Sequence, residues 1–104
     1  MVNMNEKIKQ VNKMSNISKV LENTYKYLGH KHLSVSTRKD KKFMVLNPET
    51  LKYSHFGSIN YKDFTKHQDM DRRDNYLKRA IGIKGDWKND KYSPNNLSIN
   101  ILWN

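Results

Sequence analysis

The chain has 104 residues, of which 20 are Lys or Arg and 10 are Asp or Glu, so its formal net charge is +10. A chain of this length forms one domain with a small core, and it buries about 60 to 70% of the surface that it exposes when unfolded. Its apolar fraction is only 36%, but two Trp, six Tyr and three Phe argue against a disordered chain. The sign and size of the charge favour a polyanionic partner.

Composition also limits the chemistry and the location of the protein. The chain has no cysteine, which excludes disulfide bonds and thiolate metal sites. No segment approaches the run of about 20 apolar residues that crosses a membrane. The N-terminus lacks the apolar run of a signal peptide. We therefore expect a soluble, intracellular protein with no membrane partner.

The first segment, residues 5–28, has the spacing of an amphipathic helix that ends at Gly29. Ser15 and Asn16 interrupt the pattern, so it predicts either one helix or two short ones. We interpret residues 1–29 as a helical arm. Its apolar stripe exceeds what one hairpin covers, which predicts that the arms of two copies pair in a homodimer. The stripe comprises Ile8, Val11, Met14, Ile17, Val20 or Leu21, Tyr25 and Leu28.

The middle of the chain changes from a basic connector to alternating strands. Residues 30–42 hold five bases and one acid with little periodicity, which indicates a flexible connector. Residues 43–47 and 51–56 alternate on either side of the turn sequence Asn47-Pro48-Glu49-Thr50, and this pattern predicts a β-hairpin. Residues 58–67 fit neither period and are predicted to form a loop.

A further helix is predicted over residues 70–81. Asp69 has the character of an N-cap and Gly82 that of a stop signal. The acids of this segment come first and its bases last, which suits the helix dipole.

The tail carries two conflicting signals. Ser93 followed by Pro94 favours a short helix, whereas the alternation of apolar residues over 97–101 favours a strand. We favour the helix, with Leu102 and Trp103 packed on the hairpin. The predicted fold class is therefore α+β: an N-terminal helical arm, a β-hairpin, a capped α-helix and a short C-terminal segment, with residues 43–104 forming a small α+β domain.

Several short motifs occur over about residues 41–104. They are Lys41-Lys42-Phe43-Met44-Val45, His55-Phe56-Gly57, Tyr61, Phe64-Thr65-Lys66-His67, Asp69, Arg72-Arg73, Tyr76-Leu77, Arg79, Trp87 and Leu102-Trp103-Asn104. In this combination the segment resembles a family of small basic proteins of giant DNA viruses and tailed phages whose function is uncharacterised. The resemblance implies a role in the virion, the nucleoid or genome handling, without catalysis and without a cofactor. The helical N-terminus and Pro94-Asn95-Asn96 depart from the family pattern.

Few residues suggest catalysis or metal binding. His30 and His32, and likewise His67 and Asp69, each pair two possible ligands, whereas zinc usually takes four. No serine lies in a glycine-framed elbow, and the four glycines are too scattered to form a phosphate-binding loop. We therefore expect no enzyme, no metal and no cofactor. A small metal-dependent nuclease that uses His55 and His67 is a minor alternative.

Binding of double-stranded DNA accounts for more of the sequence, because Lys and Arg replace the counterions condensed on phosphates. Arg73 is expected to be structural, since it shares a helix face with Leu77 and can bond loop carbonyls or Asp63. Lysines 7, 9, 13 and 19 are further candidates. The predicted nucleic-acid contacts are Lys31, Arg38, Lys39, Lys41, Lys42, Arg72, Lys78 and Arg79.

Charge and resemblance together predict a sequence-nonspecific DNA-binding and DNA-condensing protein of a viral particle. It would be located in the virion and, during infection, in the host cytoplasm or viral factory. If the arm serves dimerisation, deleting residues 1–28 should weaken DNA bridging more than DNA binding. The alternative is a minor structural virion protein that binds acidic capsid or core proteins.

Overall fold

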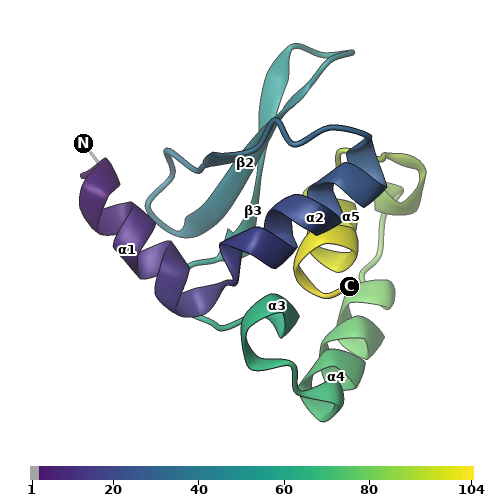
Figure 1. The fold of residues 1–104 in the computed structure, drawn as a ribbon. Coiled ribbons are helices and arrows are strands. Elements are labelled where there is room, and N and C mark those ends of the chain that lie inside the picture. Colours follow the sequence, from purple (N-terminus) through teal and green to yellow (C-terminus); the bar gives the residue numbers. More distant parts are fainter. Residues whose placement is uncertain (1–2) are drawn as a thin grey trace.

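The computed structural model describes residues 3–104 and shows an α+β fold, as predicted (Figure 1). A 3-10 turn at Trp87–Asn89 precedes the last helix, and a π-helical turn at Ser98–Leu102 continues it. The regular elements, in chain order, are α1 (Met4–Met14), α2 (Ile17–Leu28), β1 (Ser34–Val35), β2 (Lys41–Asn47), β3 (Lys52–Ser58), α3 (Phe64–His67), α4 (Met70–Ile81) and α5 (Pro94–Leu97).

The interruption at Ser15 and Asn16 separates two helices. The Asn3 side chain caps α1 by accepting hydrogen bonds from the backbone N–H groups of Asn5 and Glu6. Asn16 caps α2 in the same way through the N–H of Lys19. Of the two patterns compatible with the sequence, the one with two short helices is therefore correct.

The sheet contains one strand that the sequence did not indicate. Its three strands are antiparallel in the order β1-β2-β3, with Phe43 opposite Phe56 in the hairpin. Val35 of β1 pairs with Phe43 on the other side, so the predicted flexible connector contributes an ordered edge strand. The second strand also begins earlier than predicted, at Lys41. Two paired residues are too short a run to produce a visible alternation.

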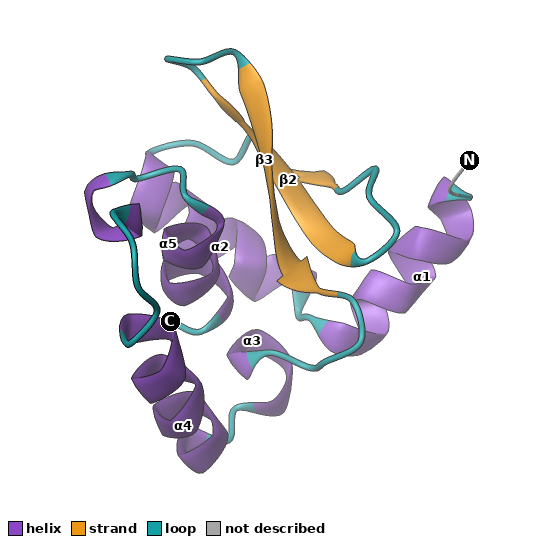
Figure 2. Cartoon of the chain, turned by 180° about the vertical axis from the view of Figure 1, so that it is seen from behind, coloured by secondary structure: helices purple, strands orange, loops and turns teal. Residues whose placement is uncertain are grey.

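One hydrophobic core joins the N-terminal helices, the hairpin and the C-terminal segment. Val11 and Val20 are fully buried in the same cluster as Phe43 and Phe56. Figures 1 and 2 show α1 and α2 on one face of the sheet. The predicted arm is thus part of the core, and its removal would expose the inner face of the hairpin. The other members of the cluster are Val45, Ile59, Leu97, Ile101 and Leu102.

The capped helices end where the sequence indicates. Asp69 accepts hydrogen bonds from the N–H groups of Asp71 and Arg72, and α4 stops at Gly82. Ser93 caps α5, with Pro94 at its first turn, so the tail is helical as favoured. The loop predicted over 58–67 instead ends in the single helical turn α3, which Asp63 caps through the N–H of Thr65.

Candidate nucleic-acid interface

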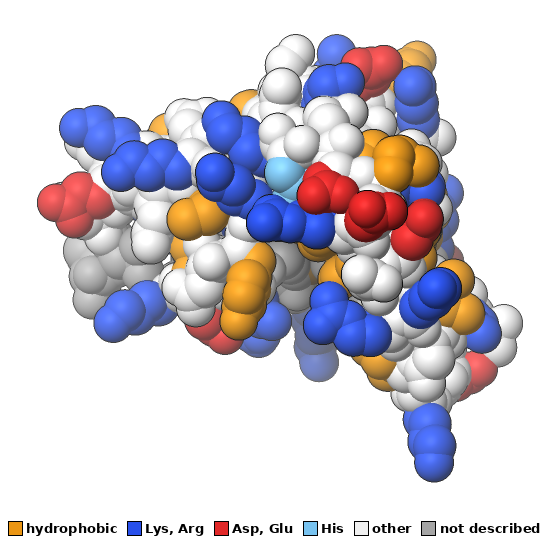
Figure 3. Space-filling view, turned by 90° about the horizontal axis from the view of Figure 1, so that it is seen from below, with side chains coloured by type: hydrophobic (Ala, Val, Ile, Leu, Met, Phe, Trp, Pro, Cys, Tyr) orange, Lys and Arg blue, Asp and Glu red, His pale blue; other side chains and the backbone are white. Residues whose placement is uncertain are grey.

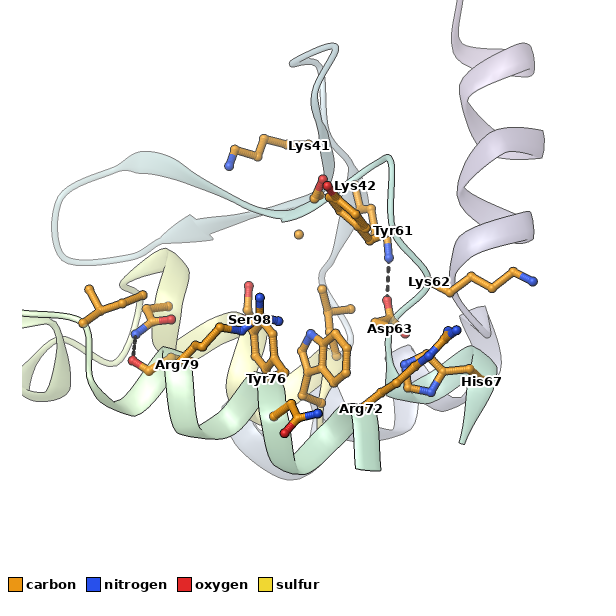
Figure 4. A pocket seen from close by; sticks show the side chains of 18 residues that line it. Lys41, Lys42, Tyr61, Lys62, Asp63, His67, Arg72, Tyr76, Arg79 and Ser98 are labelled. Carbon is orange, nitrogen blue, oxygen red and sulfur yellow. Dashed lines mark hydrogen bonds and ion pairs between the residues drawn. The ribbon is translucent and has the colours of Figure 1, made fainter. Parts of the chain in front are cut away.

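A cleft of about 820 Å³ lies between the base of the hairpin, the loop that follows it, α4 and the C-terminal segment (Figure 4). Its walls therefore come from parts of the chain that are far apart in sequence. The lining residues are Lys41, Lys42, Gly57, Ser58, Tyr61, Lys62, Asp63, His67, Arg72, Asn75, Tyr76, Arg79, Ala80, Ile83, Asn95, Ser98, Leu102 and Trp103.

A buried ion pair closes one end of the cleft. Lys42 Nζ donates to Asp63 Oδ2 at 2.8 Å, and each side chain is only 2% exposed. Lys42 Nζ also donates to the carbonyl of Met14, and Asp63 accepts further hydrogen bonds from Ser15 Oγ and from the N–H and hydroxyl of Thr65. Both buried charges thus have several partners, which offsets their loss of hydration. Burial lowers the pKa of Lys42, and the charge of Asp63 opposes this effect.

Four cationic side chains surround the cleft: Lys41, Lys62, Arg72 and Arg79. Arg72 forms an exposed ion pair with Asp69, with 3.7 Å between Nε and Oδ2. The other three form no ion pair within residues 3–104. Asp63 is the one carboxylate among the described lining residues, and Lys42 already neutralises it. The cleft therefore carries an excess of positive charge.

Aromatic side chains form two of its walls. The rings of Tyr76 and Trp103 are stacked, with centroids 4.1 Å apart and an interplanar angle of 9°. His67 packs against the indole of Trp103 at a centroid distance of 5.3 Å. Figure 4 shows Tyr61 on the opposite side of the cleft from Tyr76. Tyr61 is 70% exposed, so its ring is accessible to a ligand.

His67 contributes a donor without a partner. Its Nδ1 accepts the backbone N–H of Asp69 at 2.9 Å, so the neutral ring carries its proton on Nε2. Nε2 is buried and has no hydrogen-bond partner among the described residues. Burial, followed by the charge of Arg72, lowers the pKa of His67 and so favours the neutral form of the ring.

The predicted contact residues separate into several groups. Lys41, Arg72 and Arg79 come together at the cleft, whereas Lys78 is exposed on α4 and does not line it. Lys62 was missed, because the irregular loop around it gave no periodicity from which its direction could be read. The remaining exposed candidates are Lys31, Arg38 and Lys39 in the connector and Lys9, Lys13 and Lys19 on the N-terminal helices.

Two predicted contacts are wrong. Lys42 is only 1% exposed and bonded to Asp63, so its ammonium group cannot reach a phosphate. Lys7 is 3% exposed and donates to the backbone carbonyls of Ser36 and Arg38. Both lysines hold the fold together instead of presenting charge to solvent.

Arg73 is structural, as expected, although its partner differs from those considered. Its Nε donates to the carbonyl of Trp103 at 2.7 Å, and its guanidinium lies 5.4 Å from the centroid of Phe64. It therefore connects α4 to the C-terminal segment and to α3.

The positive charge is divided on the face that carries the helices at the bottom of Figure 1. Figure 3 shows many Lys and Arg side chains across this face, with a central group of acidic side chains and isolated acidic side chains elsewhere. Asp69, Asp71 and Asp74 are all exposed at the start of α4. Around the N-terminal end of α4 these carboxylates therefore oppose the attraction of Arg72 for a polyanion.

Within residues 3–104, no helix has both the length and the apolar character needed to cross a bilayer. Nor does the described part of the chain bring together three or more His, Cys, Asp or Glu side chains in a metal-binding arrangement. His55 does not meet His67: its Nδ1 forms a hydrogen bond of 2.6 Å with Ser36 Oγ, and it does not line the cleft.

Residues 31–80 are similar to DUF5754, a family of unknown function. The matched segment includes the basic connector, the hairpin and α4 as far as Ala80. It therefore contains all four cations of the cleft and Tyr61, but not Trp103. Comparison with curated proteins and with solved structures finds no match.

Proposed function

We propose that this protein binds double-stranded DNA without sequence preference, through contacts between Lys or Arg and phosphates. The observation that carries the proposal is the group of four cations around a cleft whose single described carboxylate is already paired. Lys41, Lys62 and Arg79 have no ion-pair partner in the described part of the chain, and Arg72 has only the exposed Asp69, so these cations can replace the counterions of a phosphate backbone.

The contacts proposed here lie on two parts of the surface. One set consists of Lys41, Lys62, Arg72 and Arg79 at the cleft, and the other of the exposed connector residues Lys31, Arg38 and Lys39. No Gly-rich loop or recognition helix is needed, because phosphate contacts position a protein on DNA without reading its bases.

Condensation requires that one protein assembly bind two DNA segments at once. We propose that a homodimer does this. Support comes from apolar side chains that remain exposed on the N-terminal helices, namely Met4, Ile8 and Tyr25, at 39%, 45% and 58%. A location in a viral particle is proposed from the resemblance described above and from the charge of the chain.

An electrophoretic mobility shift on several unrelated duplexes, at low and raised salt, tests DNA binding. We expect retardation of all duplexes alike, lost as salt rises. Lys41→Gln with Arg79→Gln should lower affinity for every duplex and make the salt dependence shallower by about two units in log K against log salt, at about 0.9 per phosphate contact.

The matched control is Lys26→Gln with Lys52→Gln, which removes the same charge from exposed sites away from the cleft. An equal effect of both double variants would show that net charge acts without a defined footprint. Absence of retardation at low salt would refute the proposal, and would direct the search to acidic capsid or core proteins.

A further inference from the structure

We infer that the cleft holds unpaired nucleotides of a single strand, with a base stacked on Tyr61 and phosphates held by the surrounding cations. This inference rests on the proposed function, because it assigns the cleft a particular form of nucleic acid. It adds a preference for single strands with unpaired bases, which phosphate contacts alone would not produce.

The dimensions of the cleft favour a small ligand. Its volume of about 820 Å³ falls in the range of about 300 to 1,000 Å³ typical of small-molecule sites. A duplex is too broad to enter such a cleft and can touch only the cations at its edge. A strand whose bases are unpaired can insert one or two nucleotides.

The aromatic residues are placed for stacking. Tyr61 exposes 70% of its surface. Across the cleft lies the stacked pair of Tyr76 and Trp103. A base between these walls replaces water on the ring of Tyr61, and stacking of this kind is tolerant of base identity.

Polar groups on both sides complete the site. Lys41 and Lys62 come from the hairpin and the loop that follows it, whereas Arg72 and Arg79 come from α4 (Figure 4). A strand that crosses the cleft therefore meets cations on either side of the base.

The test compares Tyr61→Ala with Tyr53→Ala, an equally simple removal of an exposed tyrosine ring, 54% exposed, on the hairpin outside the cleft. Fluorescence anisotropy of the full chain would measure affinity for a single-stranded oligothymidylate of about ten nucleotides and for a duplex of the same length. Polyphosphate, which has no bases, would be measured by competition.

We expect Tyr61→Ala to weaken binding of the single strand by roughly five- to 150-fold, the range that alanine substitution at a stacking residue produces. Affinity for the duplex and for polyphosphate should change less than about twofold, since neither presents a free base face. Tyr53→Ala should leave all three affinities unchanged.

Three other outcomes would overturn the inference. If Tyr61→Ala leaves single-strand affinity unchanged while the wild-type protein binds duplex DNA, the cleft takes no base and the proposed function stands alone. If Tyr61→Ala weakens the binding of all three ligands equally, Tyr61 maintains the shape of the cleft and does not stack on a base. A wild-type protein that binds neither strand form would refute the inference and the proposed function together.

Discussion

Gly57 and Leu102 are packed so closely that a Cβ atom added to Gly57 would lie 2.7 Å from Cδ1 of Leu102. The backbone of Gly57 also has φ of +82°, a region that favours glycine. This contact brings the C-terminal segment onto β3 and thereby forms one wall of the cleft.

Gly57→Ala should destabilise the protein by about 2 to 4 kcal/mol, from left-handed backbone strain and overpacking together. Gly29→Ala is the matched control, because Gly29 has a similar φ of +80° but no atom within 4 Å of its added Cβ. We expect the control to lose only the strain component, about 1 to 2 kcal/mol. Denaturant unfolding measures both, and equal losses would show that the contact with Leu102 is easily relaxed.

Replacing either partner of the buried ion pair should be costly. Asp63→Ala leaves the Lys42 ammonium buried with only the Met14 carbonyl, and removes the acceptor of Ser15 and Thr65 as well. We expect a loss of about 3 to 5 kcal/mol in the free energy of unfolding, and a smaller loss for Lys42→Met, which leaves Asp63 its other donors.

Lys26→Met is the control for the ion pair, since the pair of Lys26 and Glu22 is 62% exposed on both sides. Exposed pairs of this kind contribute about 0.3 to 0.5 kcal/mol. If Lys42→Met cost no more than Lys26→Met, the buried pair would not be a determinant of stability.

Stability should fall as the pH is lowered below the ordinary pKa of histidine. The pKa of His67 in the folded state lies below 6.5, because burial and then Arg72 disfavour its charged form, while Asp69 and Asp63 partly oppose this. The unfolded state therefore takes up the proton first. The contribution of His67 to the free energy of unfolding is complete above about pH 6.5, and it is lost as the pH falls through the folded-state pKa.

His67→Asn supplies the comparison for this pH dependence, because an amide oxygen can replace Nδ1 as the acceptor from Asp69 without titrating. Its unfolding free energy, measured from about pH 7 to pH 5, should depend less steeply on pH. Some slope should remain, since burial also lowers the pKa of His55. If the free energy of unfolding depended on pH equally steeply in the wild type and in His67→Asn, His67 would be excluded as a source of the acid sensitivity.

Deleting residues 1–28 should abolish cooperative unfolding. The deletion removes Val11 and Val20 from the core and the buried Lys7 from the carbonyls that it bonds. Circular dichroism during heating would show this loss. The burial of these residues therefore replaces the expectation that the deletion weakens DNA bridging more than DNA binding. A truncated chain that unfolds cooperatively would show that the hairpin and α4 are sufficient for folding.

The sequence contained good local signals for where elements begin and end. Asp69, Gly82, Ser93 and Gly29 act as caps or stops because capping depends on groups a few residues away, which the sequence displays directly. Short elements were harder: α3 has four residues and β1 has two, less than a period needs to become visible.

The candidate site could be predicted only in part, because it depends on contacts between distant segments. Lys42 stands in a basic run that indicates an exposed surface, yet its partner Asp63 lies 21 residues away and no local pattern reveals the pairing. The stacking of Tyr76 on Trp103 likewise joins residues that only the folded chain brings together. Arg72 and Arg79 were predicted because helical spacing placed them on the outer side of α4.

Because Lys7 and Lys42 are buried, their chemical modification can be used to detect local opening of the structure. Amine-reactive acylating reagents modify lysines that reach solvent, and these two ammonium groups reach it only when the surrounding segments separate. Acyl groups found on Lys42 by mass spectrometry would therefore report transient opening at the cleft, and those on Lys7 would report separation of α1 from the backbone at Ser36 and Arg38, whereas surface lysines react without any opening.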